Sequence, residues 1–81
     1  MKDLVEYLAK SLVEYPDQVR VTQREDMDTI VIELRVSSED MGKVIGKQGR
    51  IAKAIRTLVK ASASQDERKK IAVDIMSLDE E

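Results

Sequence analysis

The sequence predicts a two-layer α+β domain in which three helices cover one face of a three-stranded sheet. Apolar residues recur at helical spacing in three segments and at strand spacing in three others. The segments follow in the order helix, strand, strand, helix, helix, strand. Each expected strand has one apolar and one mixed face, which is typical of a sheet covered on a single side.

The first helix is expected from about Asp3 to Glu14. Its apolar residues recur at helical spacing: Leu4, Val5, Leu8, Leu12 and Tyr15. Asp3 and Glu6 have the spacing of a capping box. Pro16 ends the helix, because the residue before a proline is driven out of the helical region.

A hairpin is expected next. Val19 and Val21 alternate with polar residues and indicate a short strand. Residues 25–28 are polar and turn-like. The clearest strand runs from Thr29 to Val36 and directs Ile30, Ile32, Leu34 and Val36 to one face. Val31 then belongs to the other, exposed face, where Met76 of the last strand is also expected.

The second helix is expected to begin at Ser37 or Ser38, either of which can cap it. Glu39 and Asp40 then lie in its first turn, where carboxylates interact favourably with the helix dipole. Gly46 ends the helix.

A third, longer helix opens at Gly49. One half of its helical wheel is apolar and the other basic. The apolar half is wider than one sheet needs, so its surplus lines a groove, meets a partner subunit or packs on neighbouring helices. The apolar half consists of Ile51, Ala52, Ala54, Ile55, Leu58, Val59, Ala61 and Ser62.

After a polar connection at residues 64–68, a last strand is expected from Lys70 to Met76, followed by an acidic tail at residues 78–81. The whole chain, residues 1–81, is expected to form a single domain with a core spanning about residues 3–77.

The composition argues against an enzyme. The chain has neither His nor Cys, so the commonest general bases, nucleophiles and metal ligands are missing. We expect no catalytic residue, no metal and no cofactor. The acidic pair Glu25-Asp26 is interpreted as part of a turn, and the pair Glu39-Asp40 as the start of a helix. No stretch has the length of a membrane span or the pattern of a signal peptide, so a cytoplasmic location without membrane contact is expected.

Positive charge is concentrated in one segment. The chain has 14 Lys and Arg against 16 Asp and Glu. Six of the basic residues and no acidic residue lie between Lys43 and Lys60, so the rest of the chain carries a net charge of −8. An acidic protein therefore presents a local site for an anion.

The turn Gly46-Lys47-Gln48-Gly49 lies inside this basic segment. Two glycines leave the backbone uncovered, so a sugar-phosphate chain can approach main-chain N–H groups at the start of the third helix. Lys47 projects from the turn. Lys43, Arg50 and Lys53 lie within about one helical turn of it. The pattern predicts an extended site for several successive phosphates.

The segment from Val44 to Ile55, VIGKQGRIAKAI, resembles the signature of KH domains, whose GxxG loop clamps about four nucleotides of a single strand. The element order is similar to the type II, prokaryotic arrangement. By this resemblance Gly46 and Gly49 admit the backbone, and Lys47 and Gln48 form the variable pair. The RNA-binding residues are expected to be Lys43, Ile45, Gly46, Lys47, Gln48, Gly49, Arg50, Ile51, Ala52, Lys53 and Ile55.

By the same resemblance to KH domains, an aliphatic groove beside the loop is lined at its base or back by Ile45, by Ile51 or Ala52, and by Ile55. Its opposite wall comes from the sheet and from the loop near residues 64–69. The length of the chain and the segment GKVIGKQGRIAKAIRTLVKA are similar more narrowly to the KhpA family of small bacterial KH proteins. That resemblance implies single-stranded RNA binding, an RNA-chaperone role, and action with a KhpB-type partner in cell elongation and wall synthesis. Separately, the surplus apolar arc of the third helix allows a homodimer, which would raise the affinity for RNA.

Two other readings remain open from the residues alone. In a helix-turn-helix reader of duplex DNA, the third helix would present Lys53, Arg56 and Lys60 to the major groove, although the segment lacks Asn and the rest of the chain is acidic. In a protein-interaction adaptor, the wide apolar arc would meet a partner.

Overall fold

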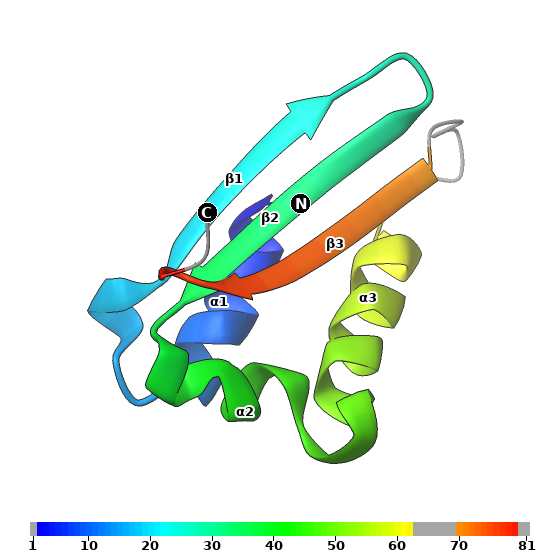
Figure 1. Cartoon of the computed structure of the whole chain (residues 1–81). Coiled ribbons are helices and arrows are strands. Elements are labelled where there is room, and N and C mark those ends of the chain that lie inside the picture. The colour runs from blue at the N-terminus through cyan, green and yellow to red at the C-terminus, as the bar shows by residue number, and fades with distance from the viewer. Residues whose placement is uncertain (1, 63–69, 80–81) are drawn as a thin grey trace.

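The sheet is built around β2 (Thr29–Val36), its central strand. The computed structural model describes residues 2–62 and 70–79. β2 pairs antiparallel with β1 (Arg20–Glu25) and parallel with β3 (Lys70–Ser77), so the sheet is mixed (Figure 1). The predicted bounds of β2 are confirmed. β1 runs on to Glu25, because its pairing with Ile30 extends the ladder into the predicted turn.

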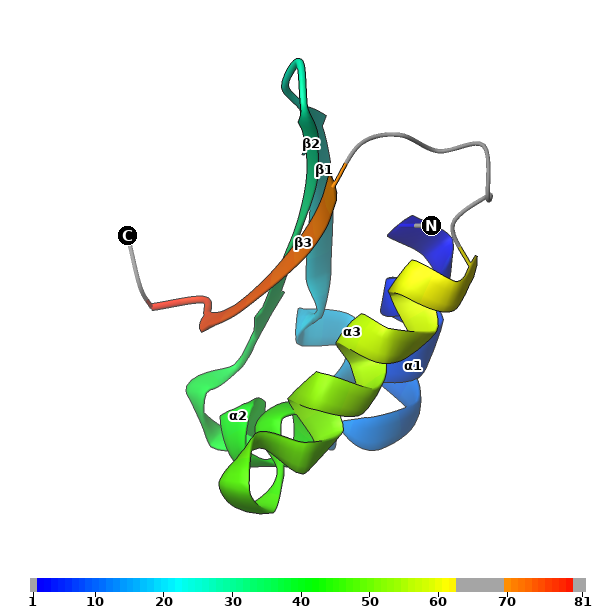
Figure 2. The ribbon, with the colours of Figure 1, turned by 90° about the vertical axis from the view of Figure 1, so that its right-hand side faces the viewer.

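Three helices lie on one side of the sheet, as Figure 2 shows. They are α1 (Lys2–Leu12), α2 (Met41–Ile45) and α3 (Arg50–Ser62). Single 3-10 turns precede β1, α2 and α3, at Pro16–Gln18, Ser38–Asp40 and Lys47–Gly49. The predicted α+β class and element order are confirmed. The expected connection at residues 64–68 and the end of the acidic tail lie outside the described residues.

The core between the two layers is aliphatic. Alternate residues of β2 point into it, and Ile32, Leu34 and Val36 are fully buried. The helices supply the facing residues, all of them buried: Val5, Ala9, Val44, Ile55 and Val59. Every second residue of β2 faces the helices, and on α1 and α3 the apolar residues recur about every 3.6 positions. These two periodicities determine which face of each helix packs against the sheet.

The outer face of the sheet departs from the prediction at Val31. This residue is 8% exposed, although no helix covers its face of the sheet. β2 is the central strand, and Val31 has Arg24 of β1 on one side and Ala72 of β3 on the other. Neighbours on both sides screen it from water, so its exposure was wrongly predicted. Met76, on the edge strand β3, is half-buried.

The apolar half of α3 divides into a buried and an exposed part. Ala52, Ile55 and Val59 face the core. Ala54, Leu58 and Ala61 are exposed, and Leu58 keeps 47% of its surface. The surplus width of the apolar arc is therefore not used in packing against neighbouring helices of the described chain.

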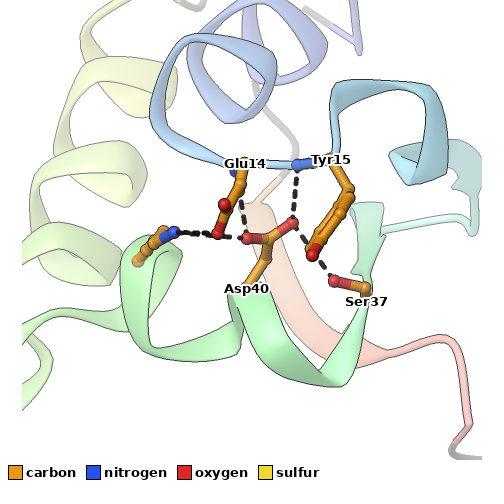
Figure 3. Close-up of polar contacts among 5 residues, drawn as sticks. Glu14, Tyr15, Ser37 and Asp40 are labelled. Carbon is orange, nitrogen blue, oxygen red and sulfur yellow. Dashed lines mark hydrogen bonds and ion pairs between the residues drawn. The ribbon is translucent and has the colours of Figure 1, made fainter.

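A buried carboxylate joins the end of α1 to the start of α2 (Figure 3). Asp40 is fully buried, and its oxygens accept hydrogen bonds from the backbone N–H groups of Glu14 (3.0 Å) and Tyr15 (3.1 Å). α1 stops at Leu12 rather than at the predicted Glu14, and these two N–H groups point to Asp40 instead of to helical carbonyls. Since the partners lie 25 and 26 positions apart, no local pattern could indicate this ending.

The predicted roles of Ser37 and Asp40 are corrected by the same contacts. Neither side chain makes a capping hydrogen bond to the helix. The Ser37 hydroxyl donates to Asp40 Oδ2 at 3.1 Å. Burial alone would raise the pKa of Asp40, but hydrogen bonds from the Glu14 and Tyr15 N–H groups and the Ser37 hydroxyl, together with the nearby Lys43 charge, lower it below its ordinary value. The Asp40 carboxylate and its contacts with Glu14, Tyr15 and Ser37 form a clasp that joins the end of α1 to the start of α2, which the sequence did not predict.

The turn between α2 and α3 needs its glycines for two different reasons. Gly46 has φ 77° and ψ 175°, a combination essentially restricted to glycine. A Cβ atom there would lie 2.6 Å from Cγ1 of Ile51. Gly49 has φ 76° but open space around it. Between them, Gln48 has φ 59° and ψ 24°, a left-handed conformation that is uncommon outside glycine and asparagine.

Replacing Asp40 by Asn should lower the melting temperature by roughly 5–10 °C at pH 7, because an amide N–H₂ cannot accept from both backbone donors. Since the folded pKa is lowered, the wild-type carboxylate stabilises the fold above about pH 4 and loses this effect as the pH falls. Thermal denaturation between pH 3 and pH 7 should show the two proteins converging at acid pH. Glu39→Gln, which removes an exposed neighbouring carboxylate, is the control. An equal loss in both variants would contradict the clasp.

Gly46→Ala and Gly42→Ala form a matched pair, since Gly42 is an exposed residue of α2. A Cβ atom at Gly42 meets nothing within 4 Å, so alanine should stabilise the chain by about 0.5–1 kcal/mol. Alanine at Gly46 meets Ile51 in a glycine-only conformation and should cost roughly 1–3 kcal/mol. Urea unfolding measures both. Equal stabilities for the two variants would show that the turn relaxes without cost.

Candidate nucleic-acid interface

Two backbone donors of the loop Gly46–Gly49 are not used by the described backbone. The Gly49 N–H group donates to the Gly46 carbonyl at 3.1 Å. The N–H groups of Lys47 and Gln48 have no backbone acceptor among the described residues. Lys47 keeps helical angles and Gln48 is left-handed, and this alternation turns successive N–H groups toward one point, as in an anion-binding nest. The loop can therefore receive phosphate oxygens through its main chain.

Exposed cations surround these donors. Lys47, Arg50 and Lys53 are exposed, and within the described ranges none of them forms an ion pair. Their charges are not neutralised by the acidic remainder of the chain. The predicted gathering of positive charge at the start of α3 is thus present, and it faces solvent rather than another element.

Lys43 differs from the other predicted cations. Its Nζ lies 3.1 Å from Oε2 of Glu14 and 3.8 Å from Oδ1 of Asp40. The hydrogen bond to Glu14 raises the pKa of Lys43, with a smaller contribution from the charge of Asp40. Lys43 therefore completes the clasp between α1 and α2. A phosphate would have to compete with two carboxylates for its ammonium group.

The aliphatic residues predicted to line a groove fall into two groups. Ile45 and Ile51 are half-buried, and Ile51 covers the backbone of Gly46. Ala52 and Ile55 are buried in the core, with 4% and 3% exposure. Of these four predicted residues, Ile45 and Ile51 retain surface next to the loop, and the buried pair can support them from behind.

Sequence reasoning missed the contact that Arg56 makes. Its Nε donates to the backbone oxygen of Val73 at 3.2 Å, which links α3 to the edge strand β3. The helical wheel places Arg56 on the basic half of the helix and indicates no partner for it. An exposed basic residue in the middle of a helix gives no local signal of such a contact, because β3 is distant in sequence.

Within residues 2–62 and 70–79, no three Asp or Glu side chains gather closely enough to hold a metal ion. Over the same ranges, no helix has the length and apolar character needed to cross a membrane.

Solved structures support the fold. The chain superposes on the protein Era, in a crystal structure with MgGDPNP and nucleotides of 16S ribosomal RNA, with a TM-score of 0.64 and 20% identity. It superposes on Aquifex aeolicus Era with a TM-score of 0.65. The alignments cover 95% of this chain but 30% of each Era chain, so the likeness concerns the type II KH fold alone.

Curated relatives are similar over almost the whole chain. The RNA-binding protein KhpA of Clostridium perfringens is 60% identical over 76 residues, which cover 94% of this chain and all of the relative. The KhpA proteins of Clostridium acetobutylicum and Caldanaerobacter subterraneus are each 57% identical over the same length. The KH domain of KhpA and KhpB matches residues 2–75. The chain therefore belongs to the KhpA/KhpB family of KH-domain proteins.

Proposed function

We propose that this protein binds single-stranded RNA, with the sugar-phosphate backbone held at the loop Gly46–Gly49. The observation that carries the proposal is the coincidence of uncovered loop N–H donors with the unpaired, exposed cations Lys47, Arg50 and Lys53. Phosphates supply most of the affinity in such a site, and N–H donors position them. Bases beside the loop would lie against Ile45 and Ile51.

The comparisons support RNA as the ligand. The curated relatives carry the name RNA-binding protein, and one structure of Era includes nucleotides of ribosomal RNA. The helix-turn-helix alternative requires the basic side of α3 to enter a major groove. Arg56, in the middle of that side, is exposed but hydrogen-bonded to Val73 of the edge strand β3, so its side chain is tied to the domain rather than free to reach into a groove. That position disfavours deep insertion into a duplex.

The proposal extends to the role that the family resemblance implies. The protein acts as an RNA chaperone in the cytoplasm, as a homodimer or with a KhpB-type partner, in the control of cell elongation and wall synthesis. The exposed strip of Ala54, Leu58 and Ala61 on α3 supports a protein contact, because it is apolar, continuous at helical spacing and uncovered in the described chain.

Replacing Lys47 and Gln48 together by Asp should abolish binding of a short single-stranded RNA, since two negative charges would oppose phosphate at the loop. Fluorescence anisotropy measures binding, and circular dichroism checks that the fold is retained. Lys10→Asp on α1, which makes the same change of charge as Lys47→Asp alone, is the control for net charge and should leave binding nearly unchanged. Full binding by the double variant would remove the loop from the interface.

Leu58→Glu should leave the fold intact, because the side chain is exposed, but should weaken self-association by placing a charge in the apolar strip. Sedimentation velocity of the wild type and the variant, with and without RNA, measures the mass. A wild type that stays monomeric up to high protein concentration would contradict the homodimer. A dimer unaffected by the substitution would place the contact elsewhere.

A further inference from the structure

Among the described residues, Arg56 is the cation of α3 that a hydrogen bond ties to the sheet. Its Nε donates to the Val73 oxygen at 3.2 Å, across the space between α3 and the edge strand β3. The residue is nevertheless exposed. A guanidinium group is planar, and a hydrogen bond through Nε restricts the orientation of that plane while the terminal amino groups keep their donors. The side chain therefore presents a fixed flat surface at the edge of the domain.

The basic side of α3 leads from the loop to this surface. Lys53, Arg56 and Lys60 follow one another at intervals of three and four residues, so they form one row along the helix. Because Arg56 reaches β3, the row lies on the side of α3 that faces the sheet edge. A strand whose phosphates are held at Gly46–Gly49 can continue along this row, with its bases turned toward Arg56.

No aromatic ring is available at this place to stack on a base. The chain has no Phe or Trp, and its two tyrosines, Tyr7 and Tyr15, lie on α1 and just before β1. Single-stranded nucleic acids are commonly bound by stacking bases on aromatic side chains or on guanidinium planes. Since the loop, α3 and β3 contain no aromatic side chain, a guanidinium plane is the remaining group on which a base can stack there.

We propose that Arg56 is the stacking platform for a nucleobase of bound single-stranded RNA, placed one step beyond the phosphate-binding loop. The inference rests on the proposed RNA binding and adds to it a base contact that depends on the shape of the side chain and not only on its charge. The pinned Nε orients the guanidinium plane, and the base stacks on the face of that plane.

Two substitutions separate shape from charge. Arg56→Lys keeps the cation and can still donate to Val73, but it loses the plane. Arg56→Tyr restores a plane without the charge. Each variant is titrated by fluorescence anisotropy with a short single-stranded RNA and with the same oligomer made abasic. Arg50→Lys, at the first residue of α3, is the control for an arginine that acts through charge, and thermal melting checks that every variant is folded.

The expected result is that Arg56→Lys weakens binding of the intact RNA by about fivefold or more but leaves binding of the abasic oligomer unchanged. Arg56→Tyr should bind the intact RNA more tightly than Arg56→Lys. Equal affinity of Arg56→Lys and wild type for intact RNA would overturn the inference, as would an equal loss on both oligomers, which would indicate a backbone contact. If the wild type itself binds neither oligomer, the proposed function fails first.

Discussion

The buried carboxylate of Asp40 is the interaction on which the arrangement of the candidate site depends. A charge in the interior is tolerated only when it is fully hydrogen-bonded, and here backbone donors from Glu14 and Tyr15, the Ser37 hydroxyl and the Lys43 ammonium all converge on it. α2, which follows directly, has five residues and is too short to be stable alone. Asp40 fixes its start against α1, and the packing of Val44 in the core holds its body. The position of the loop Gly46–Gly49, which follows α2 directly, is therefore determined by these two contacts.

The loop Gly46–Gly49 combines a strained backbone with N–H groups that have no backbone acceptor among the described residues. Gly46 occupies a conformation closed to other residues, and Gln48 takes a left-handed conformation that costs on the order of 1 kcal/mol. Strain of this kind persists where the surroundings impose it, and here both ends of the turn are anchored. This turn leaves the N–H groups of Lys47 and Gln48 without a backbone acceptor among the described residues, beside exposed cations. An acidic protein thus keeps one region where backbone donors and exposed cations lie together. Lys43, which sequence alone grouped with those cations, instead pairs with Glu14 and Asp40.

Most elements of the fold were predictable because they bury one face. β2 was predicted with its observed bounds, since its alternating aliphatic residues leave little freedom of register. α3 was predicted to within a residue, since its amphipathic pattern is strong. The predictions were wrong where a residue distant in sequence determines the end of an element or the burial of a side chain. α1 ends early because Asp40 takes its next N–H groups, β1 is longer because β2 extends the ladder, and Val31 is buried because it has strands on both sides.

The sequence by itself determined the fold class, the glycine turn and the concentration of positive charge, because these depend on local periodicity, on backbone freedom and on a count of charged residues. Only the tertiary structure decided which side chains of the basic segment remain available. It paired Lys43 with Glu14, set Arg56 on the edge of β3, buried Ala52 and Ile55, and left Lys47, Arg50 and Ile51 at the surface. The physical reason is that an ion pair or a burial requires a second element at a fixed distance, and that distance is set by how α1, α3 and β3 pack.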